Sequence, residues 1–83
     1  MARNAKISLE NRDKYIALGL NISYYRKWEG MTQEQLAERA SISRSYLGEI
    51  EAPNMTTTVS LEVLFNISTA LRIPVSRLFE FRD

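Results

Sequence analysis

The stretch from residue 32 to residue 51, TQEQLAERASISRSYLGEIE, spaces its polar side chains so that they gather on one side of a short predicted helix. That side has no large apolar group and comprises Arg44, Ser45, Gly48 and Glu49. A guanidinium can donate two parallel hydrogen bonds to the major-groove edge of guanine, and a helix fits into that groove. The chemistry open to these residues is therefore hydrogen bonding to bases and phosphates.

The residues that other kinds of chemistry require are absent from the chain. Cysteine and histidine are both absent from the chain. Their absence excludes disulfides, thiol chemistry and the usual zinc sites, and it removes the commonest general base. No nucleophile–base pair is visible in the sequence. We therefore expect a protein that is not an enzyme, with no metal or other cofactor and no small-molecule ligand.

The length and net charge of the chain further restrict the classes of protein to which it can belong. The chain has 83 residues, which predicts one domain with a small core, and 45% of them are apolar. No apolar run reaches the length of a membrane span and the N-terminus lacks the core of a signal peptide, so we expect a cytoplasmic protein with no membrane partner. The net charge is only +1, which predicts few phosphate contacts and a shallow salt dependence for any binding to DNA.

The segment 32–51 is itself acidic. Two arginines against four glutamates, two minus four, leave it with a net charge of −2. Those six residues are Arg39, Arg44, Glu34, Glu38, Glu49 and Glu51. If this segment binds DNA, its acids must face away from the duplex, while bases and backbone amides face towards it.

Helical periodicity predicts the elements that hold this segment. We assign residues 1–12 to an N-terminal arm and residues 13–83 to the domain. The first helix has an apolar face at three- to four-residue spacing, and Gly30 ends it in the left-handed conformation. Its apolar face comprises Tyr15, Leu18, Ile22 and Tyr25. Thr32 and Gln35 are placed to cap the second helix reciprocally, and Ser43 to cap the third. Ser41 falls in the turn between them, where a positive φ would cost a serine on the order of 1 kcal/mol.

The C-terminal half predicts two further helices after a loop over residues 52–59. Ser60 caps the fourth helix, and Pro74 suits the first turn of the fifth. The fourth has a predicted core face of Leu61, Leu64, Ile67 or Ser68, and Leu71. The fifth presents Val75, Leu78 and Phe79. Apolar residues alternate from Phe79 to Arg82, so a short strand is the alternative there.

The chain resembles the helix-turn-helix of the Cro and phage-repressor family, also called the XRE-like family. LGLNISYYRKWEG resembles the first helix of that family, MTQEQLAERASISRSYLGEIE the second and third, and SLEVLFNISTALRIPVSRLF the fourth and fifth. The resemblance covers roughly residues 18–79 and places the helix-turn-helix at residues 32–51. It implies an all-α fold, a lambda-repressor-like compact bundle of about five helices.

The resemblance also implies roles for particular residues. Gln33 would reach a phosphate and brace the recognition helix, and Arg44 would read a base, with a phosphate contact as the alternative. The full set of implied DNA-binding residues is Gln33, Ser43, Arg44, Ser45, Tyr46, Gly48 and Glu49. Arg26 and Glu51 match a structural ion pair between the first and third helices.

The function that follows is sequence-specific binding of double-stranded DNA by a transcriptional regulator, of the repressor or restriction–modification controller type. An antitoxin or protein-interaction module of a toxin–antitoxin pair is the alternative. Because one recognition helix contacts few base pairs, we expect a homodimer on an inverted-repeat operator. A surplus of apolar residues in the C-terminal half marks the expected interface, with local packing as the alternative. These residues are Phe65, Val75, Leu78, Phe79 and Phe81.

Overall fold

The computed structural model describes residues 7–81, and within them four α-helices are followed by a short 3-10 helix. The elements are α1 (Leu9–Trp28), α2 (Gln33–Ala40), α3 (Arg44–Glu51), α4 (Leu61–Leu71) and η1 (Val75–Phe79). The predicted all-α class is confirmed, and the predicted fifth helix is the 3-10 helix. No strand forms in the described part of the segment 79–82.

The first helix begins within the segment that we assigned to an N-terminal arm. Ser8 caps α1 because its hydroxyl accepts a hydrogen bond from the Asn11 amide at 3.2 Å. Residues 9–12, which we assigned to an N-terminal arm, therefore belong to α1. The arm residues 1–6 lie outside the described range. At its other end α1 gives way to Gly30, which adopts the predicted positive φ, of 74°.

The predicted caps on α2 and α3 are both present. Thr32 accepts a hydrogen bond from the Gln35 amide, while the Gln35 side chain accepts one from the Thr32 amide, so the capping box is complete. Ser41 follows α2 with φ 60° and ψ 40°, the left-handed conformation whose cost to a serine we noted. Ser43 then caps α3 by accepting from the Tyr46 amide at 3.0 Å. These caps fix the angle between the two helices.

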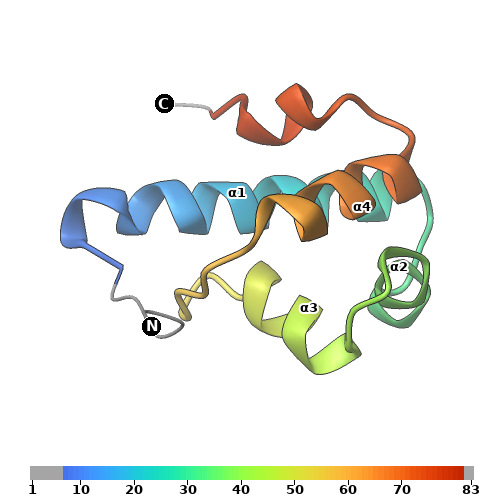
Figure 1. The fold of residues 1–83 in the computed structure, drawn as a ribbon, viewed down its shortest axis with the longest axis horizontal. Coiled ribbons are helices and arrows are strands. Elements are labelled where there is room, and N and C mark those ends of the chain that lie inside the picture. The colour runs from blue at the N-terminus through green and yellow to red at the C-terminus, as the bar shows by residue number, and fades with distance from the viewer. Residues whose placement is uncertain (1–6, 82–83) are drawn as a thin grey trace.

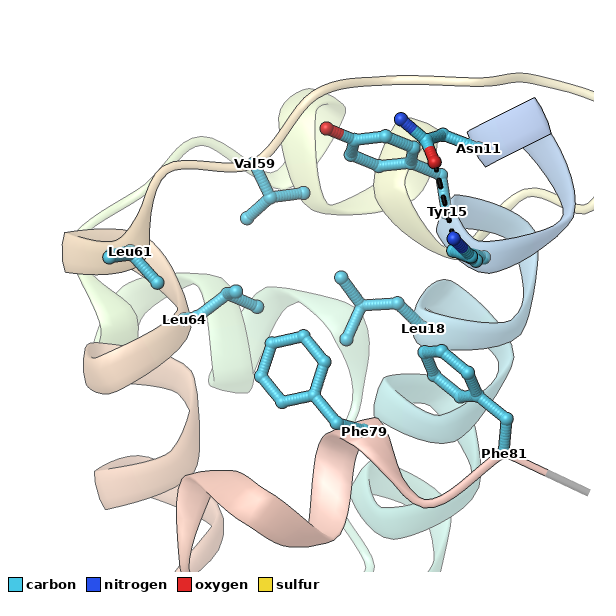
Figure 2. Close-up of a pocket in the computed structure, with 9 residues that line it drawn as sticks. Asn11, Tyr15, Leu18, Val59, Leu61, Leu64, Phe79 and Phe81 are labelled. Atoms are coloured by element: carbon cyan, nitrogen blue, oxygen red, sulfur yellow. Dashed lines mark hydrogen bonds between the residues drawn. The ribbon is translucent and has the colours of Figure 1, made fainter. Parts of the chain in front are cut away.

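The helices surround one apolar core. It comprises Leu18, Ile22, Leu36, Ala37, Ala40, Leu47, Ile50, Leu64, Ile67, Leu71 and Leu78. Most predicted core positions are confirmed, including both Ile67 and Ser68, but Leu61 is 64% exposed. Leu61 fails to reach the core because it borders an open groove between α1, α4 and the C-terminal segment (Figure 2).

Figure 1 shows how this arrangement frees α3. Helices α1 and α4 run through the middle of the molecule, η1 crosses on one side of them, and α2 and α3 lie on the other. The Asn21 side chain holds the C-terminal segment on its side by donating to the carbonyls of Leu78, at 2.9 Å, and Glu80, at 3.3 Å. One long face of α3 consequently remains uncovered.

Candidate nucleic-acid interface

Helix α3 has two chemically distinct faces. Leu47, Ile50 and Glu51 are buried against the rest of the domain. Arg44, Ser45 and Glu49 are exposed. We call this exposed side, with Gly48, the outer face. It is the polar face that the sequence predicted, and Arg44 stands at the first residue of the helix.

The inner end of α3 is fixed by a buried ion pair. The Arg26 guanidinium meets the Glu51 carboxylate through two hydrogen bonds, Nε to Oε2 at 2.8 Å and Nη2 to Oε1 at 2.9 Å. Arg26 also donates to the Met31 carbonyl at 2.7 Å. Both side chains are at least nine-tenths buried. The predicted ion pair is therefore present, and its paired geometry offsets the cost of burying two charges.

Gln33 joins the same network. Its amide nitrogen donates to Glu51 Oε1 at 3.0 Å, which links the start of α2 to the end of α3. This contact is the brace that the resemblance implied. An amide nitrogen carries two hydrogens, so Gln33 keeps a second donor for an acceptor outside the protein. Its carbonyl oxygen lies on the Gly48 side of the outer face, 3.8 Å from where a Cβ on Gly48 would stand.

Tyr46 makes a contact that the sequence did not predict. Its half-buried ring packs against the core, and its hydroxyl donates to the Thr58 carbonyl at 2.8 Å. Burial of the phenol and the nearby Glu49 carboxylate both raise its pKa above the ordinary value of 10.0. The tyrosine is therefore a neutral donor held within the protein, at the edge of the outer face.

Two further predicted contact residues are Ser43, the N-cap of α3, and Gly48, in the second half of that helix. Ser43 is exposed, and its oxygen serves the helix cap, so its hydroxyl proton is the group left to donate. A Cβ on Gly48 would meet only the Gln33 side-chain oxygen, at 3.8 Å, so the missing side chain allows close approach of another molecule to the backbone.

Two further residues hold this surface and were missed in the sequence. Gly19 lets α1 lie against the backbone of α3, since a Cβ there would overlap the Ile50 carbonyl. A glycine in the middle of a strong helical period was the available signal. Asn21 anchors the C-terminal segment through two backbone carbonyls, and nothing in local sequence marks such a distant pairing.

The proposed dimer residues divide into two groups. Phe65, Phe79 and Phe81 are 48%, 46% and 39% exposed. Val75 is half-buried. Leu78, in contrast, is fully buried in the core, so its assignment to an interface is wrong. It faces inward because η1 presents one side to α1 and α4. Figure 2 shows Phe79 and Phe81 on the C-terminal side of the apolar groove, with Leu18 of α1 and Leu64 of α4 nearby.

Two negative findings apply to the described residues. Across positions 7–81, no cluster of three or more potential His, Cys, Asp or Glu ligands could hold a metal ion. Over the same range, every helix is too short or too polar to cross a membrane.

Comparison with known proteins defines the class. Residues 17–78 match a family model described as Helix-turn-helix. The chain belongs to the helix-turn-helix family of Cro and phage repressors, the XRE-like family.

Particular relatives agree with this class. The transcriptional regulator SinR of Bacillus licheniformis is 36% identical over 66 residues, which are 80% of this chain and 59% of SinR. The chain thus spans little more than half of that relative. The restriction–modification controller protein C.AhdI from Aeromonas hydrophila has a crystal structure that superposes with a TM-score of 0.75 at 31% identity, covering 81% of this chain and 98% of that one. SinR in complex with DNA superposes with a TM-score of 0.70 at 36% identity, over 76% of this chain and 98% of that one.

Proposed function

We propose that this protein is a sequence-specific, double-stranded DNA-binding transcriptional regulator of the repressor or restriction–modification controller type. The observation that carries the proposal is the outer face of α3, which is polar, exposed and held from behind by the buried contacts of Glu51 with Arg26 and Gln33. A rigid helix with a free polar face is what insertion into the major groove requires. The relatives described above are a transcriptional regulator and a restriction–modification controller, which favours this function over an antitoxin.

In this proposal each polar residue has a separate task. Arg44 pairs with the major-groove edge of a guanine from the first turn of α3. Gln33 donates one amide hydrogen to Glu51 and the other to a DNA phosphate. Ser43 and Ser45 bond to bases or phosphates, Gly48 admits close approach, and Glu49 accepts from cytosine or rejects the wrong base.

The low net charge of the chain favours binding to DNA as a dimer over tight binding by a single chain. The net charge of +1 gives weak non-specific attraction to DNA. A two-fold dimer compensates by placing two recognition helices about 34 Å apart on an inverted repeat. We assign the interface to the exposed Phe65, Phe79 and Phe81, with Val75, around the apolar groove of Figure 2. Because its target is DNA, we also place the protein in the cytoplasm, and we propose no catalytic role.

A selection from random DNA tests the proposal directly. The full chain is mixed with a pool of random duplexes, and the bound duplexes are amplified and sequenced over several rounds. We expect one inverted repeat to be enriched and to bind at least about 10³-fold more tightly than a scrambled duplex of equal length. A pool that stays random while the protein is folded would contradict sequence-specific binding. Enrichment of a single half-site would contradict the dimer alone.

A further inference from the structure

The loop between α3 and α4, residues 52–60, is tied to the recognition helix by one side chain. The Tyr46 hydroxyl donates to the Thr58 carbonyl, twelve positions along the chain, at 2.8 Å. Within the loop the Met55 amide donates to the Ala52 carbonyl at 3.2 Å. A loop of this length without helix or strand has considerable conformational freedom, and a bond across it removes part of that freedom.

The hydroxyl of Tyr46 cannot serve the DNA backbone at the same time. A phenol carries one proton, and Tyr46 donates it to Thr58. Phosphate oxygens in DNA accept hydrogen bonds and donate none. Because the Tyr46 proton is engaged in this way, the side chain has nothing to donate to a phosphate. This argues against a direct hydrogen bond from Tyr46 to the DNA backbone.

The position of Tyr46 on α3 determines where its hydrogen bond to Thr58 holds the loop relative to the outer face. Successive residues of an α-helix are about 100° apart, so Tyr46 lies about 160° around α3 from Gly48, beyond the Glu49 edge of the outer face. Gln33 lies near Gly48, towards the other edge. The Tyr46 hydroxyl holds the Thr58 carbonyl of the loop on the Glu49 side. A helix in the major groove has a phosphate backbone on each side of it, so each edge faces one strand.

We infer that Tyr46 is a positioning residue for DNA binding, and that its hydroxyl holds the loop so that the hydroxyls of Thr56, Thr57 and Thr58 meet the phosphate backbone opposite the one reached by Gln33. The inference rests on the proposed function and deepens it. Threonine hydroxyls are suitable donors to phosphate, and all three are half-buried or exposed. Tyr46 thus sets the distance between the base-reading helix and a second, sequence-independent contact.

Tyr46→Phe tests the inference because it removes only the hydroxyl. Its matched control is Tyr25→Phe, which makes the same change on another half-buried tyrosine of the core. Affinity is measured by fluorescence anisotropy on the enriched duplex and on a scrambled one, at a temperature where all variants are folded. We expect Tyr46→Phe to weaken binding to both duplexes by about two- to tenfold, with their ratio unchanged, and Tyr25→Phe to leave both affinities as they were.

A second variant links the effect to the loop. Substitution of the three threonines by valine removes their hydroxyls and leaves the Thr58 carbonyl in the backbone. If Tyr46 acts through these hydroxyls, Tyr46→Phe should cost little or no further affinity in the valine background. Amide hydrogen exchange should also become faster over residues 55–59 in Tyr46→Phe while exchange within α3 is unchanged.

Several outcomes would overturn the inference. One is a Tyr46→Phe variant that binds both duplexes like the wild type, and another is the same loss of affinity with and without the threonine hydroxyls. A changed ratio between the two duplexes would show that Tyr46 itself contacts bases. A folded wild-type chain that binds no duplex would overturn the proposed function and this inference together, whereas a wild type that binds with Tyr46→Phe unaffected would overturn the inference alone.

Discussion

Gly19 of α1 lies directly against the backbone carbonyl of Ile50 in α3, and a Cβ atom on Gly19 would overlap that oxygen. Backbone cannot move aside as the tip of a flexible side chain can, so Gly19→Ala must push the two helices apart. We predict that this substitution lowers the free energy of unfolding by about 1–3 kcal/mol, measured by urea denaturation.

Gly48→Ala is the matched control for Gly19→Ala, because it makes the same change in the middle of another helix. The nearest atom to a new Cβ at position 48 is 3.8 Å away. Alanine favours a helix over glycine by about 1 kcal/mol, so this variant should be more stable than the wild type. Equal stabilities for the two variants would show that α1 and α3 tolerate a wider crossing.

The Glu51→Ala substitution would leave the Arg26 guanidinium buried without its carboxylate. Removing one member of a buried pair costs about 3–5 kcal/mol, and we expect a loss of that order in thermal unfolding. Arg77→Ala supplies the contrast, since Arg77 and Glu80 form an exposed pair at 3.9 Å. That control should shift the melting temperature hardly at all. Similar shifts for both variants would mean that the buried pair contributes no more than a surface one.

Ser41→Gly should stabilise the fold. Ser41 adopts φ 60°, a conformation that strains any residue with a Cβ by roughly 1 kcal/mol or more and that glycine adopts freely. Chemical denaturation should show an increase of up to about 1 kcal/mol, because part of the gain is lost to the greater freedom of glycine in the unfolded chain. Ser45→Gly, inside α3, should have the opposite sign. A decrease for both would indicate that the serine hydroxyl at position 41 contributes more than the strain costs.

Arg44→Ala should reduce the affinity for a specific DNA site more than the affinity for non-specific DNA. A bidentate contact with guanine contributes about 1–3 kcal/mol of discrimination, so affinity for the enriched duplex should fall far more than affinity for a scrambled one. Gln33→Ala should weaken both more evenly, because phosphates are the same in every sequence. Anisotropy titrations on the two duplexes decide between these patterns. An even loss for Arg44→Ala would reassign that side chain to a phosphate.

Phe65→Glu should dissociate the proposed homodimer and preserve the fold. The side chain is 48% exposed on α4, so a carboxylate there desolvates only when a second chain covers it. Sedimentation at micromolar concentration should give a dimer for the wild type and a monomer for the variant, with equal helical content by circular dichroism. Leu9→Glu, at the exposed start of α1, is the control and should stay dimeric. A wild-type monomer that binds a half-site tightly would refute the dimer.

Local chemistry made the turn and caps predictable from the sequence. Thr32, Ser43 and Ser60 accept hydrogen bonds from amides three residues on, and such pairs are visible as short-range patterns. The Arg26–Glu51 pair was predicted from the family resemblance. The base-reading roles of Arg44 and the other outer-face residues remain predictions.

The wrong and missed predictions concern contacts between distant segments, which the periodicity of the sequence does not reveal. Leu61 and Leu78 belong to equally apolar stretches, yet one is exposed and the other fully buried, because burial depends on which segment returns to cover each residue. The tie from Tyr46 to Thr58 uses a backbone carbonyl, a group every residue possesses. The start of α1 rests on the Ser8 cap, which lies before the apolar face predicted for the first helix.

The division of α3 into a buried face and an outer face has an evolutionary consequence. Residues that anchor the helix, Leu47, Ile50 and Glu51, are not those that meet the solvent, Arg44, Ser45 and Glu49. Mutations on the exposed side change no core contact, so their effect on stability should stay small. Under the proposed function, descendants of this chain can therefore acquire new operator preferences one residue at a time, without first accumulating compensating changes in the scaffold.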